Sequence, residues 1–179
     1  MKLRLILSAL LSLAAFSAFG ADQSTIQIPK AVLDRHNASC PDFSSEQGQY
    51  LMKEVYTLPA GEYSKTPKSL YILGCELYAY NSRELAYIVD SYGDITNVAV
   101  SEVATDRSIT ATSDLMGTAF DQAGLMLSTY SKGRGVGDCG SSAAYKYDAN
   151  SEKFVLLEAR LKEQCDGDVE SDWPVVYSK

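Results

Sequence analysis

Short runs of hydrophobic residues, separated by polar and turn-forming residues, recur along the chain from Tyr50 onward. Tyr50–Tyr56 is expected to form a strand that ends before Pro59-Ala60-Gly61. Ser69–Leu73 is an apolar run typical of a buried strand, and Cys75–Tyr80 continues it past Gly74. Runs of this length, bounded by Gly, Pro, Asp and Ser, favour strands over helices.

The rest of the pattern predicts hairpins and one helix. The expected strand pairs are Glu84–Val89 with Ile95–Val103, Thr118–Phe120 with Leu125–Tyr130, and Ala143–Tyr147 with Phe154–Leu161. In the second hairpin we expect Gly124 in the left-handed region. Pro29 suits the first turn of a short N-terminal helix ending near Asn37. We therefore predict a mainly β fold, an antiparallel sandwich or small barrel with one short helix.

The first twenty residues have the pattern of a secretory signal. Lys2 and Arg4 precede the apolar stretch Leu5–Phe16, and Ala18-Phe19-Gly20 favours cleavage before Ala21. The stretch is short for a membrane-spanning helix, which needs about 20 apolar residues. We expect no membrane span after cleavage, and residues 21–179 are expected to form a single β-rich domain, built as one unit or as two packed β halves.

Four cysteines, Cys40, Cys75, Cys139 and Cys165, follow the leader. An even number in an exported chain indicates two disulfides, and four cysteines allow three pairings. We favour Cys40–Cys75 and Cys139–Cys165, the order in which the cysteines emerge during export. A zinc site is disfavoured because no Cys-x-x-Cys pair exists. We predict no metal and no cofactor.

The charge balance narrows the class of partner. The formal net charge is −7, and removing a leader with Lys2 and Arg4 makes the remainder more acidic. Nucleic acid and anionic lipid require clustered Lys and Arg, so we expect no nucleic-acid partner. An acidic surface suits a basic protein partner, or serves only solubility.

A glycine-rich segment, Lys132–Gly140, contains four glycines, Arg134, Asp138 and Cys139. It lacks the Gly-Lys-Ser/Thr ending of a P-loop, so a structural loop is favoured over phosphate binding. Arg134 and Asp138 either pair within the loop or contact a ligand. The candidate binding residues are Lys132, Arg134, Asp138 and Trp173; the alternative role for Trp173 is closing one end of the core.

Candidates for catalysis are weak. His36 is the single histidine, with Asp34 too close in sequence to face it on a helix, and no Gly-x-Ser-x-Gly elbow exists. We expect an exposed surface histidine and assign no catalytic residue. Carboxylates are abundant, yet the sequence selects no glycosidase pair. Asp148–Glu152 is expected to form a hairpin turn rather than a calcium loop.

Several motifs carry a resemblance. They are Lys132–Gly140, Tyr145-Lys146-Tyr147, Phe154-Val155-Leu156, Cys165-Asp166-Gly167, Asp172-Trp173-Pro174, and Cys75 followed by Ala79-Tyr80-Asn81. Together they resemble the domain-of-unknown-function 1176 family of exported bacterial proteins. Where such proteins often have a tryptophan after the Gly-Asp-Cys-Gly loop, this chain has Tyr145 and Tyr147. The resemblance implies export and paired cysteines, and no catalytic residue.

Taken together, these features favour a non-catalytic periplasmic or secreted binding module, for instance an inhibitor of a basic envelope-active enzyme. A rigid, disulfide-linked loop can be presented to a partner at low entropic cost. Two alternatives stay open: a hydrolase of envelope polymers that uses an unidentified carboxylate pair, and a structural envelope protein.

Overall fold

The computed structural model describes residues 26–169 and 172–179. The expected leader, residues 1–20, and its cleavage site lie outside these residues. The helices and strands are α1 (Lys30–Ser39), the 3₁₀ turns Pro41–Ser44 and Gln47–Tyr50, β1 (Lys53–Leu58), β2 (Lys68–Leu77), β3 (Ser82–Val89), β4 (Ile95–Asn97), β5 (Val100–Val103), β6 (Ile109–Thr112), β7 (Leu115–Met116), β8 (Ala119–Asp121), β9 (Met126–Lys132), β10 (Gly140–Asp148), β11 (Lys153–Lys162) and β12 (Val175–Ser178).

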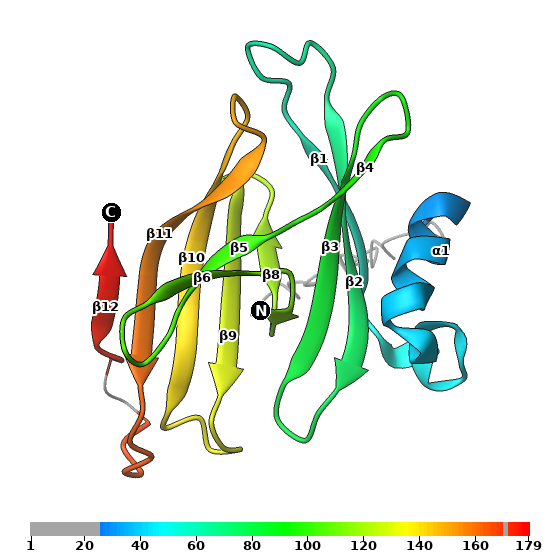
Figure 1. Ribbon diagram of the computed structural model, residues 1–179. Coiled ribbons are helices and arrows are strands. Elements are labelled where there is room, and N and C mark those ends of the chain that lie inside the picture. Colours follow the sequence, from blue (N-terminus) through cyan, green and yellow to red (C-terminus); the bar gives the residue numbers. More distant parts are fainter. Residues whose placement is uncertain (1–25, 170–171) are drawn as a thin grey trace, which may run out of the picture.

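Two antiparallel sheets make up the body of the molecule (Figure 1). The first has the order β1-β2-β3-β4, with β7 also pairing with β3; the second has the order β12-β11-β10-β9-β8. A separate two-stranded ribbon, β5–β6, lies in the chain between β4 and β7 of the first sheet and reaches across to the second sheet, where β5 contacts β11 (Figure 1). Neither sheet closes on itself within the described residues, so the mainly β prediction is confirmed in its sandwich form and not as a barrel.

The main core lies between the two sheets. From the first sheet it contains Leu70 and Ile72, and from the second Leu127, Tyr145 and Leu156, all buried. Side chains alternate between the faces of a strand, so Leu70 and Ile72 point inward while their neighbours point to the opposite face. That opposite face of the first sheet is also covered, which explains why the sequence there is apolar without alternation.

Helix α1 and the turn after it cover the outer face of the first sheet. Val32 of the helix packs there with Phe43, Leu73 and Tyr87 in a second buried cluster. The helix begins directly after Pro29, as its fixed φ predicts, and ends at Ser39. No helix in residues 26–169 and 172–179 is long and apolar enough to cross a membrane.

Both predicted disulfides are confirmed. Cys40 bonds to Cys75 and Cys139 bonds to Cys165, and the described residues contain no free cysteine. The first disulfide links the end of α1 to β2 of the first sheet. The second links the loop before β10 to the segment after β11.

Three local predictions were wrong. Tyr50 does not begin the first strand, because Gln47–Tyr50 is a 3₁₀ turn and β1 starts at Lys53. The strand predicted over Ile95–Val103 is divided, because its last backbone hydrogen bond to β3 is that of Val98, and Val100–Val103 pairs with β6 instead. Gly124 does not carry the positive φ; Leu125 does, with φ 53°.

The reason for glycine at position 124 is space. A Cβ there would lie 2.4 Å from Oδ2 of Asp121, an atom that accepts a hydrogen bond from the backbone N–H of Gly124. The turn is therefore held by an aspartate side chain, and the left-handed residue follows one position later. The turn at Asp148 is of the same kind: its carboxylate accepts from the backbone N–H of Asn150 and the hydroxyl of Ser151.

Four strands were not predicted: β5 as a separate strand, β6, β7 and β12. They have two to four residues each, and β6 is largely exposed. Such short segments carry too few alternating positions to be recognised from the pattern of hydrophobic residues.

Candidate functional site

One end of the sandwich gathers most of the residues singled out in the sequence. It is formed by the β2–β3 connection (residues 78–81), the glycine-rich loop between β9 and β10 (residues 133–139) and the segment after β11 (residues 163–168), and lies at the bottom of Figure 1. The Cys139–Cys165 disulfide is located there, and Cys75 of the other disulfide lies in β2 shortly before the β2–β3 connection, so we call it the stapled end.

Asp138 is the centre of the glycine-rich loop. Its carboxylate is fully buried and accepts hydrogen bonds from Nε of Arg134 at 2.7 Å, from Nη2 of Arg134, and from the backbone N–H of Gly167 at 2.6 Å. Arg134 also donates to the carbonyl of Cys165 at 3.2 Å. The Arg134 guanidinium holds the pKa of Asp138 far below its usual range. The pair joins the loop to the segment that carries Cys165.

The loop approaches its neighbours more closely than a side chain would allow. Gly140 has φ +142°, and a Cβ there would lie 1.9 Å from the carbonyl oxygen of Ser131. A Cβ on Gly135 would lie 2.6 Å from the ring of Tyr80. Glycine at these positions lets backbone and aromatic ring pack directly, as the structural interpretation of the loop predicted.

Trp173 and Lys132 lie beside the loop. The Trp173 ring is largely buried and stacks on Tyr130, with centroids 5.0 Å apart and planes 13° apart. The backbone N–H and carbonyl of Lys132 are both bonded to the side-chain amide of Asn81, at 2.8 and 2.9 Å. All four candidate binding residues thus meet at the stapled end. Asp138 and Trp173 are buried there, whereas the Arg134 side chain is 47% exposed.

Exposed aromatic and aliphatic side chains lie on this loop and on the β2–β3 hairpin beside it, and Tyr50 lies next to Leu77 and Tyr78 of that hairpin. We define the tyrosine surface as Tyr50, Leu77, Tyr78, Tyr80 and Val136, each at least half exposed. Next to Tyr50 and Tyr78 lies a shallow groove of about 410 Å³, with Asp42 and Glu76 among its lining residues. The sequence reasoning missed this surface because Cys75–Tyr80 was interpreted as strand; the signal was two tyrosines at the end of a hairpin.

The position of Tyr78 is set by neighbouring charges. Its hydroxyl donates a hydrogen bond to the Glu76 carboxylate, which also pairs with Arg83 at 3.0 Å. The Tyr78 hydrogen bond and the Arg83 guanidinium lower the pKa of Glu76, while the bond to Glu76 raises the pKa of Tyr78. Tyr78 is therefore held as a neutral phenol with its ring exposed.

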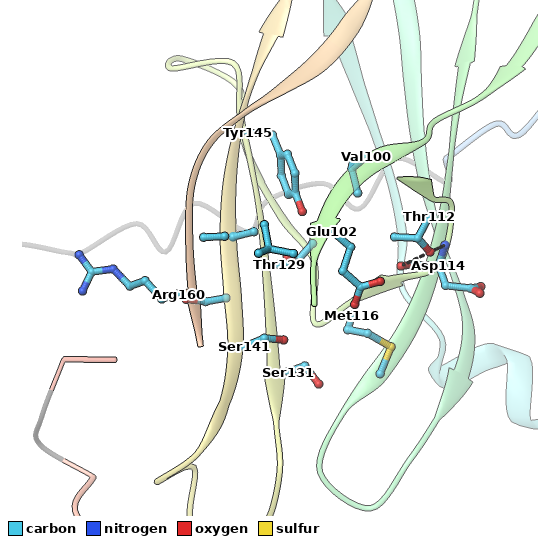
Figure 2. Close-up of a pocket in the computed structure, with 14 residues that line it drawn as sticks. Val100, Glu102, Thr112, Asp114, Met116, Thr129, Ser131, Ser141, Tyr145 and Arg160 are labelled. Carbon is cyan, nitrogen blue, oxygen red and sulfur yellow. Dashed lines mark hydrogen bonds between the residues drawn. The ribbon is translucent and has the colours of Figure 1, made fainter. Parts of the chain in front are cut away.

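A second site lies between the β5–β6 ribbon and the second sheet. Figure 2 shows this ribbon cleft, with Glu102 on the ribbon side and Ser131 and Ser141 on the sheet side. Its volume is about 90 Å³. The remaining wall includes Thr129 and Tyr145, and Asp114 lies at the edge. Sequence reasoning did not find it, because the ribbon strands were not predicted.

His36 was expected on the surface, and that expectation was wrong. The ring is fully buried between α1 and the first sheet. Nε2 donates to the carbonyl of Gly74 at 2.9 Å, so Nδ1 of the neutral ring accepts from the Tyr87 hydroxyl at 3.0 Å. Burial lowers the pKa of His36. Both nitrogens are occupied by structural hydrogen bonds, which leaves none for proton transfer to a substrate.

One group of side chains has the spacing of a metal site. Ligand atoms of Asp138, Cys139 and Cys165 lie within 4.8 Å of one another. The two sulfurs, however, form a disulfide, and both Asp138 oxygens accept the hydrogen bonds described above. Metal-binding cysteines must be free thiolates, so these residues do not fit a metal centre as they stand.

Comparison with known proteins agrees with the motif resemblance. The model of the family described as "Protein of unknown function (DUF1176)" matches residues 20–179. A relative from Escherichia coli (strain K12), "Uncharacterized protein YpfG", is 31% identical over 113 residues, which cover 62% of this chain and 32% of the relative. The chain thus spans about a third of that protein. No solved structure matches the chain. With the paired cysteines and the glycine-rich loop in place, the chain belongs to the DUF1176 family.

Proposed function

We propose that the protein is a non-catalytic periplasmic binding module whose stapled end binds a basic envelope protein, such as an envelope-active enzyme that it inhibits. The observation that carries the proposal is the tyrosine surface, in which exposed rings project from a backbone held by disulfides and buried hydrogen bonds. The two disulfides support an oxidising compartment.

Rigidity is the first supporting argument. The Asn81 amide joins the β2–β3 hairpin to Lys132, the Tyr80 ring packs against Gly135, and the Arg134–Asp138 pair holds the loop. A surface that is ordered before binding loses less conformational entropy on association. Tyrosine supplies large contact area with few rotatable bonds, which is why it is enriched at binding surfaces.

Charge is the second supporting argument. The chain has a formal net charge of −7, and Asp42 and Glu76 line the groove next to Tyr78. Complementary charge accelerates association with a basic partner and disfavours acidic ones. Aromatic faces also attract lysine and arginine side chains.

The hydrolase alternative has one observation in its favour, since the ribbon cleft is lined by two carboxylates, Glu102 and Asp114. Asp114, however, is paired with Arg83 at 2.7 Å. The cleft volume of about 90 Å³ is also well below the roughly 300 Å³ of a small-molecule site. Turnover of peptidoglycan fragments by the purified protein would favour this alternative over the binding module.

The test compares two matched pairs of exposed tyrosines. Tyr78→Ser/Tyr80→Ser alters the stapled end, and Tyr63→Ser/Tyr92→Ser alters the opposite end of the sandwich, where both rings are even more exposed. Each protein is assayed for binding to, and inhibition of, a panel of purified basic lysozyme-type muramidases. We expect wild type and the Tyr63/Tyr92 variant to bind alike, and the Tyr78/Tyr80 variant at least about tenfold more weakly.

Equal binding by both variants, or binding by neither the wild type nor the control, would contradict the proposal.

The periplasmic placement has a separate check. Intact-mass measurement of the exported protein should give an N-terminus at Ala21, and a soluble product that retains residues 1–20 would contradict it.

A further inference from the structure

We propose that the ribbon cleft binds a primary ammonium group, held between the carboxylate of Glu102 and the hydroxyls of Ser131 and Ser141. Glu102 comes from β5, and the two serines come from β9 and β10, where they are direct cross-strand partners. Figure 2 shows the carboxylate and the two hydroxyls on opposite sides of one cleft. This site is separate from the tyrosine surface and goes beyond the proposed function.

The neighbouring polar groups are already occupied. The Tyr145 hydroxyl donates to the carbonyl of Ser101 at 3.0 Å, and the Thr112 hydroxyl accepts from the backbone N–H of Asp114 at 3.1 Å. Glu102, Ser131 and Ser141, by contrast, have no side-chain hydrogen bond or ion pair to any part of the chain that the structure describes. Three oxygen acceptors are thus available in one cleft.

The cleft is also negatively charged. Among its lining residues Arg160 is a cation, but its guanidinium points away from the cleft in Figure 2 and pairs with Glu158 at 2.7 Å. Arg83 neutralises Asp114 at the edge. The Glu102 carboxylate therefore has no cationic partner within the described residues, and its exposed position lets a ligand enter from solvent.

The number and kind of acceptors favour an ammonium over other cations. An ammonium is compact and has three donors, which matches three acceptors that belong to three different side chains. A guanidinium prefers two oxygens of one carboxylate in a single plane. A calcium ion requires six to eight oxygens, including several carboxylate or carbonyl ligands, and this cleft offers a single unpaired carboxylate. A volume of about 90 Å³ accommodates an ammonium head and the start of an alkyl chain.

The experiment titrates the ¹⁵N-labelled full-length protein with n-butylammonium chloride at pH 7 and follows backbone amide shifts. We expect saturable shifts at Glu102, Ser131 and Ser141 with a millimolar Kd. The variant Glu102→Gln should raise the Kd at least about tenfold, because it removes the charge and keeps the shape. Ser131→Ala/Ser141→Ala should raise it severalfold, and Glu46→Gln, a carboxylate change outside the cleft, should leave it unchanged.

Two further ligands define the outcomes. The neutral alcohol n-butanol and methylguanidinium should bind more weakly than n-butylammonium. The proposal is overturned if n-butanol shifts the same amides equally, if Glu102→Gln binds n-butylammonium as wild type does, or if no cleft amide shifts saturably. Nα-acetyl-lysine amide separates the two sources of the ammonium: binding of this probe indicates a lysine side chain, and exclusion of it indicates a free alkylamine.

This result does not depend on the tyrosine variants. If the n-butylammonium titration shows no binding, the proposal for the tyrosine surface is still tested by the muramidase panel. If no muramidase binds, the proposal for the ribbon cleft is still tested by the titration.

Discussion

Asp138 is a fully buried carboxylate in a chain with an excess of acidic residues. Burying a charge is unfavourable unless it is paired and hydrogen-bonded. Arg134 and the backbone N–H of Gly167 donate hydrogen bonds to the Asp138 carboxylate and meet that requirement. The side chains of Arg134 and Asp138 therefore act within the loop. Contact between the exposed part of Arg134 and a partner stays a prediction.

The first prediction concerns this pair. Asp138→Ala and Arg134→Ala should each lower the melting temperature by roughly 5–10 °C, because each leaves a charged or polar group without its partner. The double variant should lower it by less than the sum of the two, since partners couple. Thermal unfolding of the four proteins measures this. Single variants as stable as wild type would show that the pair does not hold the loop.

The second prediction is the pH dependence of the same pair. The pKa of Asp138 is held below its ordinary value of 3.8, so its stabilising contribution is present above about pH 4 and is lost as the pH falls through the folded pKa. The difference in melting temperature between wild type and Asp138→Asn should therefore be constant from pH 7 to 5 and shrink at pH 3. Other carboxylates titrate alike in both proteins and cancel. A constant difference down to pH 3 would contradict the assignment.

At the scale of elements, the stapled end depends on one side chain that bridges two hairpins. The Asn81 amide bonds both the N–H and the carbonyl of Lys132, which lies at the end of β9. An amide has a donor and an acceptor on one plane and can replace a short stretch of strand pairing. Through this contact the β2–β3 hairpin of the first sheet supports the glycine-rich loop of the second.

The third prediction tests this bridge. Asn81→Ala should lower the free energy of unfolding by about 1–3 kcal/mol and speed hydrogen exchange at the Lys132 amide, because two partly buried groups lose their partner. Asn81→Asp keeps the acceptor for the Lys132 N–H and loses the donor, so it should speed exchange at the Lys132 amide less than Asn81→Ala does. Denaturant unfolding measures the change in stability, and amide hydrogen exchange measures the change at Lys132. Unchanged exchange in Asn81→Ala would argue against the bridge.

At the scale of the whole molecule, two disulfides anchor different parts of the sandwich. Cys40–Cys75 attaches the helix to the first sheet, with a sequence separation of 35, and Cys139–Cys165 closes the open end of the β10–β11 hairpin, with a separation of 26. Loops of these lengths contribute about 3–4 kcal/mol each in the chain-entropy model.

The fourth prediction follows from these separations. Cys40→Ala/Cys75→Ala and Cys139→Ala/Cys165→Ala should each lower the free energy of unfolding by about 3–4 kcal/mol. Reducing conditions serve as the control: the free energy of unfolding of the wild type should then no longer exceed that of either double variant. Non-reducing peptide mapping should recover the two pairs. A peptide linking Cys75 to Cys139 would overturn the disulfide arrangement and the loop argument that depends on it.

The sequence alone determined the features that depend on local chemistry. Apolar runs between turn residues identified the long strands, Pro29 placed the helix, and four cysteines in an exported type of chain indicated the two disulfides. The four glycines favoured a structural loop, whereas the sequence left open whether Arg134 and Asp138 pair with each other or contact a ligand. Propensity and turn geometry act over a few residues, and the number of cysteines can be counted without knowing which segments meet.

Only the tertiary structure decided which distant segments meet. His36 is buried because Gly74 and Tyr87, on other elements, supply its two hydrogen bonds. The ribbon cleft exists because β5 and β6 pair with each other rather than with β3 or β4. The tyrosine surface depends on the Asn81 bridge between two hairpins. No local pattern encodes such contacts, since they result from how two sheets pack and which polar groups burial forces to find partners.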